Sequence, residues 1–212
     1  MRFKQKKDMT GTKYQLSFGV GGIFYQESVK IAELYLELKD WASVQNIVME
    51  QNILQTRTIN TAKRLCREII SRLKLLTSNE IKILTEGIRQ EQLYILWLAV
   101  CKRYKFIKDF AVEILREKFL QLNFNLTYED YDAFFYAKSE WHEELEKITD
   151  DTRNKLRQVL FKMLREADLI TDYNTINPVM LTHAIAKTIY KDSPQYLTIF
   201  PISDSDIKEC MK

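Results

Sequence analysis

Two stretches of the chain hold arginine and lysine at a density that could bind a polyanion. Residues 57–74 contain six basic residues against Glu68 alone, and residues 153–165 contain five basic residues and no acid. Guanidinium and ammonium groups neutralise phosphates and release the counterions that surround a nucleic acid. The residues that we predict to bind DNA in this way are Arg57, Lys63, Arg64, Arg67, Arg153, Lys155, Arg157, Lys162 and Arg165.

The net charge of +3 conceals a strong segregation of charge along the chain. Residues 1–13 carry five basic residues and one acid, whereas residues 128–151 carry nine acids and two lysines. Charge separated in this way favours a face made for an anionic partner over an evenly solvated surface.

Motifs for catalysis, metal binding and cofactors are incomplete. The run His142-Glu143-Glu144-Leu145-Glu146 begins like the zinc-protease helix motif, but Glu146 stands where a second histidine is required. Gly19, Gly21 and Gly22 resemble half of a phosphate loop, yet no Gly-Lys-Ser/Thr follows them. His183 sits at helical spacing among Met180, Ala184 and Lys187 and is interpreted as structural. The sequence therefore predicts no metal, no cofactor and no enzymatic activity.

The spacing of apolar residues predicts the helices that position the first basic stretch. We expect helices over residues 28–38, 41–50 and about 58–76. On the third of these, Lys63, Arg64 and Arg67 fall on the side opposite the apolar stripe. Three helices with a basic third one form the helix-turn-helix arrangement of many DNA-binding proteins.

The stretch 91–120 is predicted to be the core around which the chain folds. Its part from Leu93 to Cys101 is apolar at all nine positions, which a helix facing water on any side would not tolerate. An amphipathic pattern follows from Tyr104 to Phe119. We expect a buried central helical hairpin, preceded by a capping box that begins at Thr77.

The C-terminal part repeats the first in outline. We expect helices over residues 128–138, 139–148 and 152–167, the first two acidic and the third basic, with Thr149 as a cap. Two short extended pieces around the turn 172–175 form a candidate wing, and a last helix is expected over 179–190.

These patterns predict an all-α protein with two helix-turn-helix-like bundles, residues 1–76 and 127–212, joined by the central hairpin at 77–126. We expect the three parts to form one compact unit.

No apolar segment approaches the roughly 20 residues needed to cross a bilayer. Cys66, Cys101 and Cys210 are odd in number and widely spaced, which is typical of reduced thiols. We therefore expect a cytoplasmic protein.

An ordered set of short motifs, running from about Tyr14 to Pro201, resembles the BrxA family of bacteriophage-exclusion (BREX) defence systems. No single motif carries the resemblance. The set comprises Gly21-Gly22-Ile23-Phe24, Glu27-Ser28, Arg57-Thr58-Ile59, Lys63-Arg64, Glu68-Ile69, residues 92–102, Phe110-Ala111, Leu115-Arg116-Glu117-Lys118, residues 155–160 and residues 163–167.

The resemblance implies an all-helical DNA-binding protein without known catalytic activity, which acts beside the methyltransferase and ATPase components of its defence system. Members of the family have also been labelled inner-membrane proteins, and the short apolar run argues against that label here.

Three functions stay open at this point. The first is binding of duplex DNA, largely independent of sequence, because basic residues outnumber base-reading candidates such as Asn154 and Gln158. The second is a protein-interaction scaffold that uses the acidic segment 128–151 and the basic faces. The third is RNA binding by a helical bundle. The sequence does not predict the oligomeric state.

Overall fold

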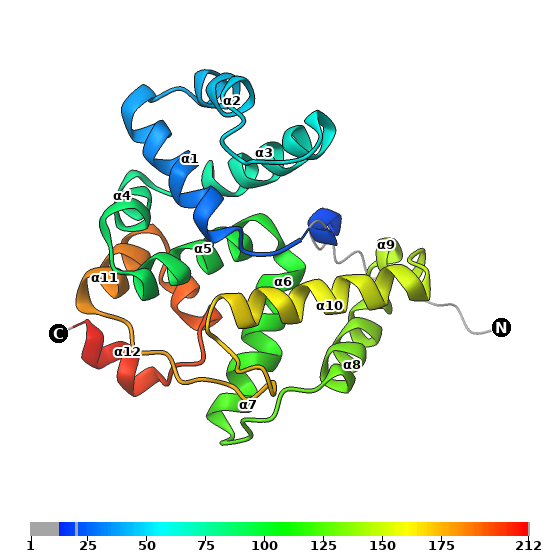
Figure 1. The fold of residues 1–212 in the computed structure, drawn as a ribbon. Helices are drawn as coiled ribbons and strands as arrows, with labels where there is room; N and C mark the ends of the chain where they lie inside the picture. The colour runs from blue at the N-terminus through cyan, green and yellow to red at the C-terminus, as the bar shows by residue number, and fades with distance from the viewer. Residues whose placement is uncertain (1–12, 20, 212) are drawn as a thin grey trace.

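The computed structural model describes residues 13–19 and 21–211, and every regular element among them is a helix (Figure 1). Extended pairing in this part of the chain is limited to two isolated bridges, Asn125 with Thr175 and Ile170 with Ile176. The predicted all-α class is confirmed.

The N-terminal helices lie close to where the sequence predicts them. They are α1 (Tyr25–Leu38), α2 (Trp41–Glu50) and α3 (Ile59–Leu73), preceded by the 3-10 turn η1 (Ser17–Gly19). The Asp40 and Thr58 side chains cap α2 and α3 by accepting hydrogen bonds from backbone N–H groups three residues on. The three helices pack on one another as a bundle.

The predicted core helix is α5 (Arg89–Arg103), which follows α4 (Ser78–Glu86) after Gly87. All residues from Leu93 to Cys101 are buried, as predicted. The capping box at the start of α4 is also present: the Thr77 and Glu80 side chains each bond the other residue's backbone N–H.

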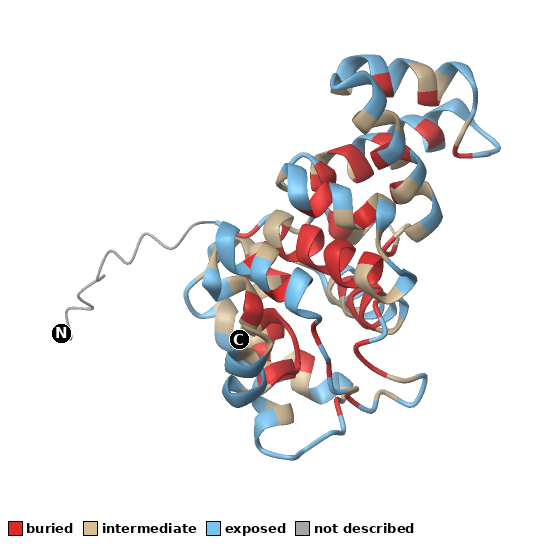
Figure 2. Cartoon of the chain, turned by 90° about the vertical axis from the view of Figure 1, so that its left-hand side faces the viewer, coloured by how far each residue is buried: buried red, intermediate tan, exposed pale blue. Residues whose placement is uncertain are grey.

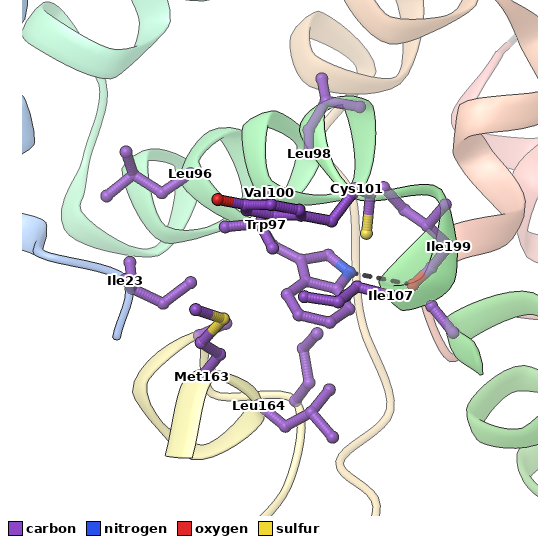
Figure 3. Packing of buried hydrophobic residues seen from close by; sticks show 14 of the residues in the cluster. Ile23, Leu96, Trp97, Leu98, Val100, Cys101, Ile107, Met163, Leu164 and Ile199 are labelled. Atoms are coloured by element: carbon purple, nitrogen blue, oxygen red, sulfur yellow. Dashed lines mark hydrogen bonds between the residues drawn. The ribbon is translucent and has the colours of Figure 1, made fainter. Parts of the chain in front are cut away.

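Trp97 lies at the centre of this core with no exposed surface. Figure 3 shows its ring beside Ile107, Met163 and Leu164, and its indole Nε1 donates a hydrogen bond to the Ile199 carbonyl oxygen at 3.1 Å. One buried cluster contains residues of all three predicted parts of the chain, from Tyr14 to Ile202. The core therefore continues across the boundaries of the proposed three-part division.

The central element differs from the hairpin that the sequence suggested. The chain leaves α5 at Tyr104, a single extended residue (φ −120°, ψ 96°), and continues as α6 (Lys105–Phe110), the π-helical turn η2 (Ala111–Arg116) and α7 (Glu117–Leu120). In Figure 1 this second arm runs down and away from α5, so the two arms form a corner instead of an antiparallel pair. The amphipathic pattern predicts both helices but carries no information about the angle between them.

The C-terminal helices are α8 (Tyr128–Ser139), α9 (Glu143–Glu146) and α10 (Asp150–Glu166). The predicted acidic helix over 139–148 is wrong in extent, because the chain turns at Trp141 and is extended at His142, which leaves only one helical turn. Thr149 caps α10 as predicted.

The segment after α10 forms the expected pair of extended pieces around a turn. The Thr171 N–H donates to the Thr175 carbonyl oxygen at 2.8 Å, and the Ile176 N–H donates to Phe124 in a third extended segment at 2.7 Å. Beyond it lie α11 (His183–Asp192), the 3-10 helix η3 (Pro194–Ile199) and α12 (Asp204–Cys210). The last predicted helix thus begins at 183 instead of 179, and α12 was not predicted.

Figure 2 shows that the N-terminal bundle projects from the rest of the molecule and that its outer sides are largely exposed. No helix in the described part of the chain has the length and apolar character required to span a bilayer.

Candidate nucleic-acid interface

The outward face of α3 is cationic. Lys63, Arg64 and Arg67 are all exposed and recur at the three- and four-residue steps that place side chains on one face of a helix. Arg57 is exposed just before the helix begins. Within residues 13–19 and 21–211, none of these four cations lies within ion-pair distance of a carboxylate.

The one acid of this stretch, Glu68, is turned inward. Its Oε1 accepts a hydrogen bond from the Arg72 Nε at 2.8 Å and another from the Tyr104 hydroxyl. Arg72 also donates to the Gly22 carbonyl oxygen at 2.6 Å, and its guanidinium lies over the Phe24 ring. Burial and the nearby Glu68 carboxylate raise the pKa of Tyr104 to about 12, so its hydroxyl remains a donor. The negative charge of Glu68 is thereby compensated on the inner side of α3, and the outer face of α3 keeps its positive charge.

On α10 the structure separates the five predicted residues into different environments. Lys155 and Lys162 are exposed and, with Gln158, form a stripe at helical spacing. The Lys162 Nζ lies 3.6 Å from Glu166 Oε1, with both side chains substantially exposed, and such surface pairs contribute little. Lys155 and Lys162 thus remain available to an anionic ligand.

Arg153 and Arg157 are among the residues predicted to bind DNA, but they are turned toward α8 and largely covered, not presented on an exposed helix face. Their side chains are only 16% and 19% exposed because both contact Asp132 of α8. Arg153 also pairs with Asp150 at 3.1 Å and lies over the Tyr136 ring, while Arg157 lies over the Tyr128 ring. Both charges are already compensated, so their expected contribution to a nucleic-acid interface is smaller.

Arg165 is half-buried as well. Its Nη1 donates a hydrogen bond to the Asn174 side-chain oxygen at 2.8 Å, which holds the turn between the two extended pieces against the end of α10. Asn174 has a positive φ of 60°, a conformation that asparagine tolerates well. Part of the donor capacity of Arg165 is therefore used within the fold.

This difference predicts unequal stability effects. Replacing both Arg153 and Arg157 by alanine should lower the free energy of unfolding by about 1–3 kcal/mol, because Asp132 then loses its partners in a poorly solvated position. Urea unfolding measures this effect, and Lys63→Ala with Arg67→Ala is the control, because exposed helical sites typically change by less than about 0.5 kcal/mol. Equal effects in the two double variants would contradict the assigned roles.

His142 and His183, the histidines considered for metal binding or catalysis, make contacts within the fold. The His142 ring packs on Tyr14 with centroids 4.1 Å apart, and its Nδ1 lies 3.2 Å from Glu144 Oε1, which also accepts from the Tyr14 N–H. The His183 Nδ1 lies 2.8 Å from the Cys210 carbonyl oxygen. Over residues 13–19 and 21–211, no group of three or more His, Cys, Asp or Glu is arranged to hold a metal ion.

These features define an all-helical protein whose projecting N-terminal bundle presents a cationic helix face. The sequence model of the BrxA family matches residues 12–193, most of the chain, and the chain belongs to this family. The BREX protein BrxA of Escherichia coli O9:H4 (strain HS) is 29% identical over 150 residues, which cover 71% of this chain and 70% of that protein.

The BREX protein BrxA of Paramagnetospirillum magneticum is 24% identical over 191 residues, 89% of this chain and 96% of that protein. A crystal structure of an uncharacterized protein from Magnetospirillum magneticum superposes with a TM-score of 0.77 at 20% identity, covering 89% of this chain and 98% of that chain. This structural similarity supports the all-helical fold of the chain.

Proposed function

We propose that the chain is a non-enzymatic accessory protein of a BREX defence system that binds duplex DNA mainly through backbone phosphates. The observation that carries the proposal is the exposed face of α3, where Lys63, Arg64 and Arg67, together with Arg57, have no carboxylate partner among the described residues. Uncompensated cations at helical spacing match the dense negative charge of a duplex.

The distribution of charge would also orient the molecule on a duplex. Residues 1–76 contain 13 basic and 7 acidic residues, whereas residues 127–212 contain 11 basic and 16 acidic residues. A polyanion therefore attracts the N-terminal end and repels most of the C-terminal end. Lys155 and Lys162 on α10 are the exceptions and form a secondary contact in this proposal. The DNA-binding role assigned to Arg153, Arg157 and Arg165 is retained only as a weaker contribution.

A cytoplasmic location fits this role, because bacterial DNA lies there. Cys66 and Cys101 are free and buried, and burial raises the pKa of both thiols, which keeps them protonated and unreactive. We propose no cofactor and no metal for the protein.

The choice between nucleic acids is tested by fluorescence anisotropy with one labelled sequence prepared as duplex DNA, single-stranded DNA and duplex RNA. The proposal expects the tightest binding to duplex DNA at every salt concentration. Preference for RNA would favour the alternative of an RNA-binding helical protein. Absence of binding to all three probes at low salt would contradict the proposal.

A protein-docking role is favoured by a separate surface around α9. Trp141 is 78% exposed, which is unusual for a tryptophan, and Glu140, Glu143, Glu146 and Asp150 around it in the sequence are exposed acids. Tryptophan is enriched at the energetic centres of protein interfaces, and the acids would select a basic partner surface. The candidate partners are the methyltransferase and ATPase components that the family resemblance implies.

Docking at this surface is tested by co-purification with those two components. Trp141→Ala should abolish recovery of the partner, whereas Tyr173→Ala, at an aromatic that is 89% exposed elsewhere, should leave recovery unchanged. Equal recovery with both variants would exclude this surface as the docking site.

A further inference from the structure

The cationic face of α3 contains two uncharged residues that phosphate binding does not require. Ile59, the first residue of the helix, is 69% exposed, although the other isoleucines of α3, Ile69 and Ile70, are buried. Asn60 follows it and is also exposed. Single exposed apolar residues are common on protein surfaces, so it is the neighbourhood of Ile59 that is informative.

Helical geometry places these two residues among the cations. Asn60, Lys63, Arg64 and Arg67 stand at positions i, i+3, i+4 and i+7 of α3, which share one face, and Ile59 borders Lys63 at a spacing of four. All five side chains are exposed. A duplex held by the cations would therefore also meet the isoleucine and the amide.

Neighbouring hydroxyl groups are occupied, whereas the amide is free. The Thr58 Oγ1 accepts a hydrogen bond from the Thr61 N–H at 3.2 Å and donates one to the Thr61 Oγ1 at 2.9 Å, so both threonines serve the helix cap. Asn60 makes no side-chain hydrogen bond within residues 13–19 and 21–211. Its donor and acceptor are available to a ligand.

The chemistry of the two side chains matches one kind of base pair. An asparagine amide can bond adenine N6 and N7 at the same time, and an aliphatic side chain packs on the C5-methyl group of thymine, both in the major groove. Lysine and arginine on the same face can hold the flanking phosphates. The pair Ile59-Asn60 thus has the composition expected for reading an A·T pair.

We infer that the first turn of α3 enters the major groove and reads A·T base pairs through Asn60 and Ile59, while Lys63, Arg64 and Arg67 hold the backbone. The inference rests on the proposed function and adds a sequence preference to it. Asn60 and Ile59 are specificity-determining residues in this arrangement, and the overall affinity stays with the cations.

The chain supplies matched controls for both residues. Asn79 occupies the second position of α4, as Asn60 does in α3, and is also exposed. Ile88 is 67% exposed at the start of α5, close to the 69% of Ile59. Alanine favours helix at exposed positions, so Asn60→Ala and Ile59→Ala should fold normally, which a thermal melt checks directly.

Selection of binding sequences from a randomised duplex library by the wild-type protein is the first experiment. The inference expects enrichment of one or more A·T pairs at fixed positions. Asn60→Ala should lose roughly tenfold discrimination at one of these pairs, while its salt dependence stays unchanged because no charge is removed. Asn79→Ala should select the same sequence as wild type.

Modified bases then test each contact on the selected duplex. Uracil in place of thymine removes the C5-methyl group and should weaken wild-type binding roughly threefold, but should not weaken binding by Ile59→Ala. Replacing adenine by 7-deazaadenine, which lacks N7, should weaken wild type and Ile88→Ala but not Asn60→Ala.

The outcomes separate this inference from the proposed function. Salt-sensitive duplex binding without any enriched sequence, or enrichment that Asn60→Ala and Ile59→Ala leave intact, would overturn base reading and keep the phosphate contacts. Failure to bind any duplex would overturn both.

Discussion

Replacing Trp97 by alanine is expected to lower the free energy of unfolding by about 3–5 kcal/mol, the usual cost of truncating a buried tryptophan. Trp97 is fully buried where α5, α10 and η3 meet, and its indole N–H satisfies the Ile199 carbonyl oxygen. The substitution therefore leaves a cavity and an unpaired buried acceptor. Because a domain of this kind is stable by only about 5–15 kcal/mol, much of the variant should aggregate on expression.

Urea unfolding of the soluble fraction of the Trp97→Ala variant measures this loss of stability. The control is Trp141→Ala. Trp141 is 78% exposed, so its removal should change the unfolding free energy by less than about 0.5 kcal/mol. Similar stability of the two variants would mean that the α5 run is not the core of the fold.

Replacing Lys63, Arg64 and Arg67 together by alanine is expected to weaken binding to duplex DNA by roughly 100-fold at about 0.15 M salt. Each phosphate contact contributes about 0.9 to the slope of log K against log salt, and its contribution to affinity vanishes near about 1 M salt. Loss of three such contacts therefore lowers K roughly 100-fold at about 0.15 M salt. Folding should be unaffected, because all three side chains are exposed and alanine is the better helix former.

The matched control removes the same charge from helices outside the N-terminal bundle. Lys187 and Lys191 of α11 and Lys208 of α12 are exposed, and their replacement by alanine changes the net charge by the same three units. Figure 1 shows α11 and α12 at the left and lower left of the molecule, outside the bundle that contains α3. If both triple variants lost equal affinity, net charge alone would explain binding, and α3 would have no special role.

Local signals predicted much of the fold because they depend on residues close in sequence. The capping box at Thr77 and the N-cap at Thr149 involve side chains that bond backbone N–H groups three residues on, so the sequence alone reveals them. The buried run of α5 was equally predictable, because nine apolar residues in succession leave no solvent-facing side.

Contacts between distant residues were not predictable in the same way. Arg153 and Arg157 have the spacing of an exposed stripe, and only the packing of α8 against α10 brings Asp132 to them across 25 residues of sequence from Arg157. The corner at Tyr104 contains no proline or glycine that would indicate a break between the two helices. For α3 the predicted exposed basic face agrees with the structure, because no carboxylate of another described element contacts that face.

The most direct test of the account is the slope of log K against log salt for duplex DNA, measured for the wild type and for the Lys63, Arg64 and Arg67 triple variant. The account predicts a wild-type slope between about −3.6, from the four cations at α3 alone, and about −5.4, if the two lysines of α10 also contact phosphates, and a slope flatter by up to about 3 in the variant. A wild-type slope near zero, or equal slopes for the two proteins, would contradict it.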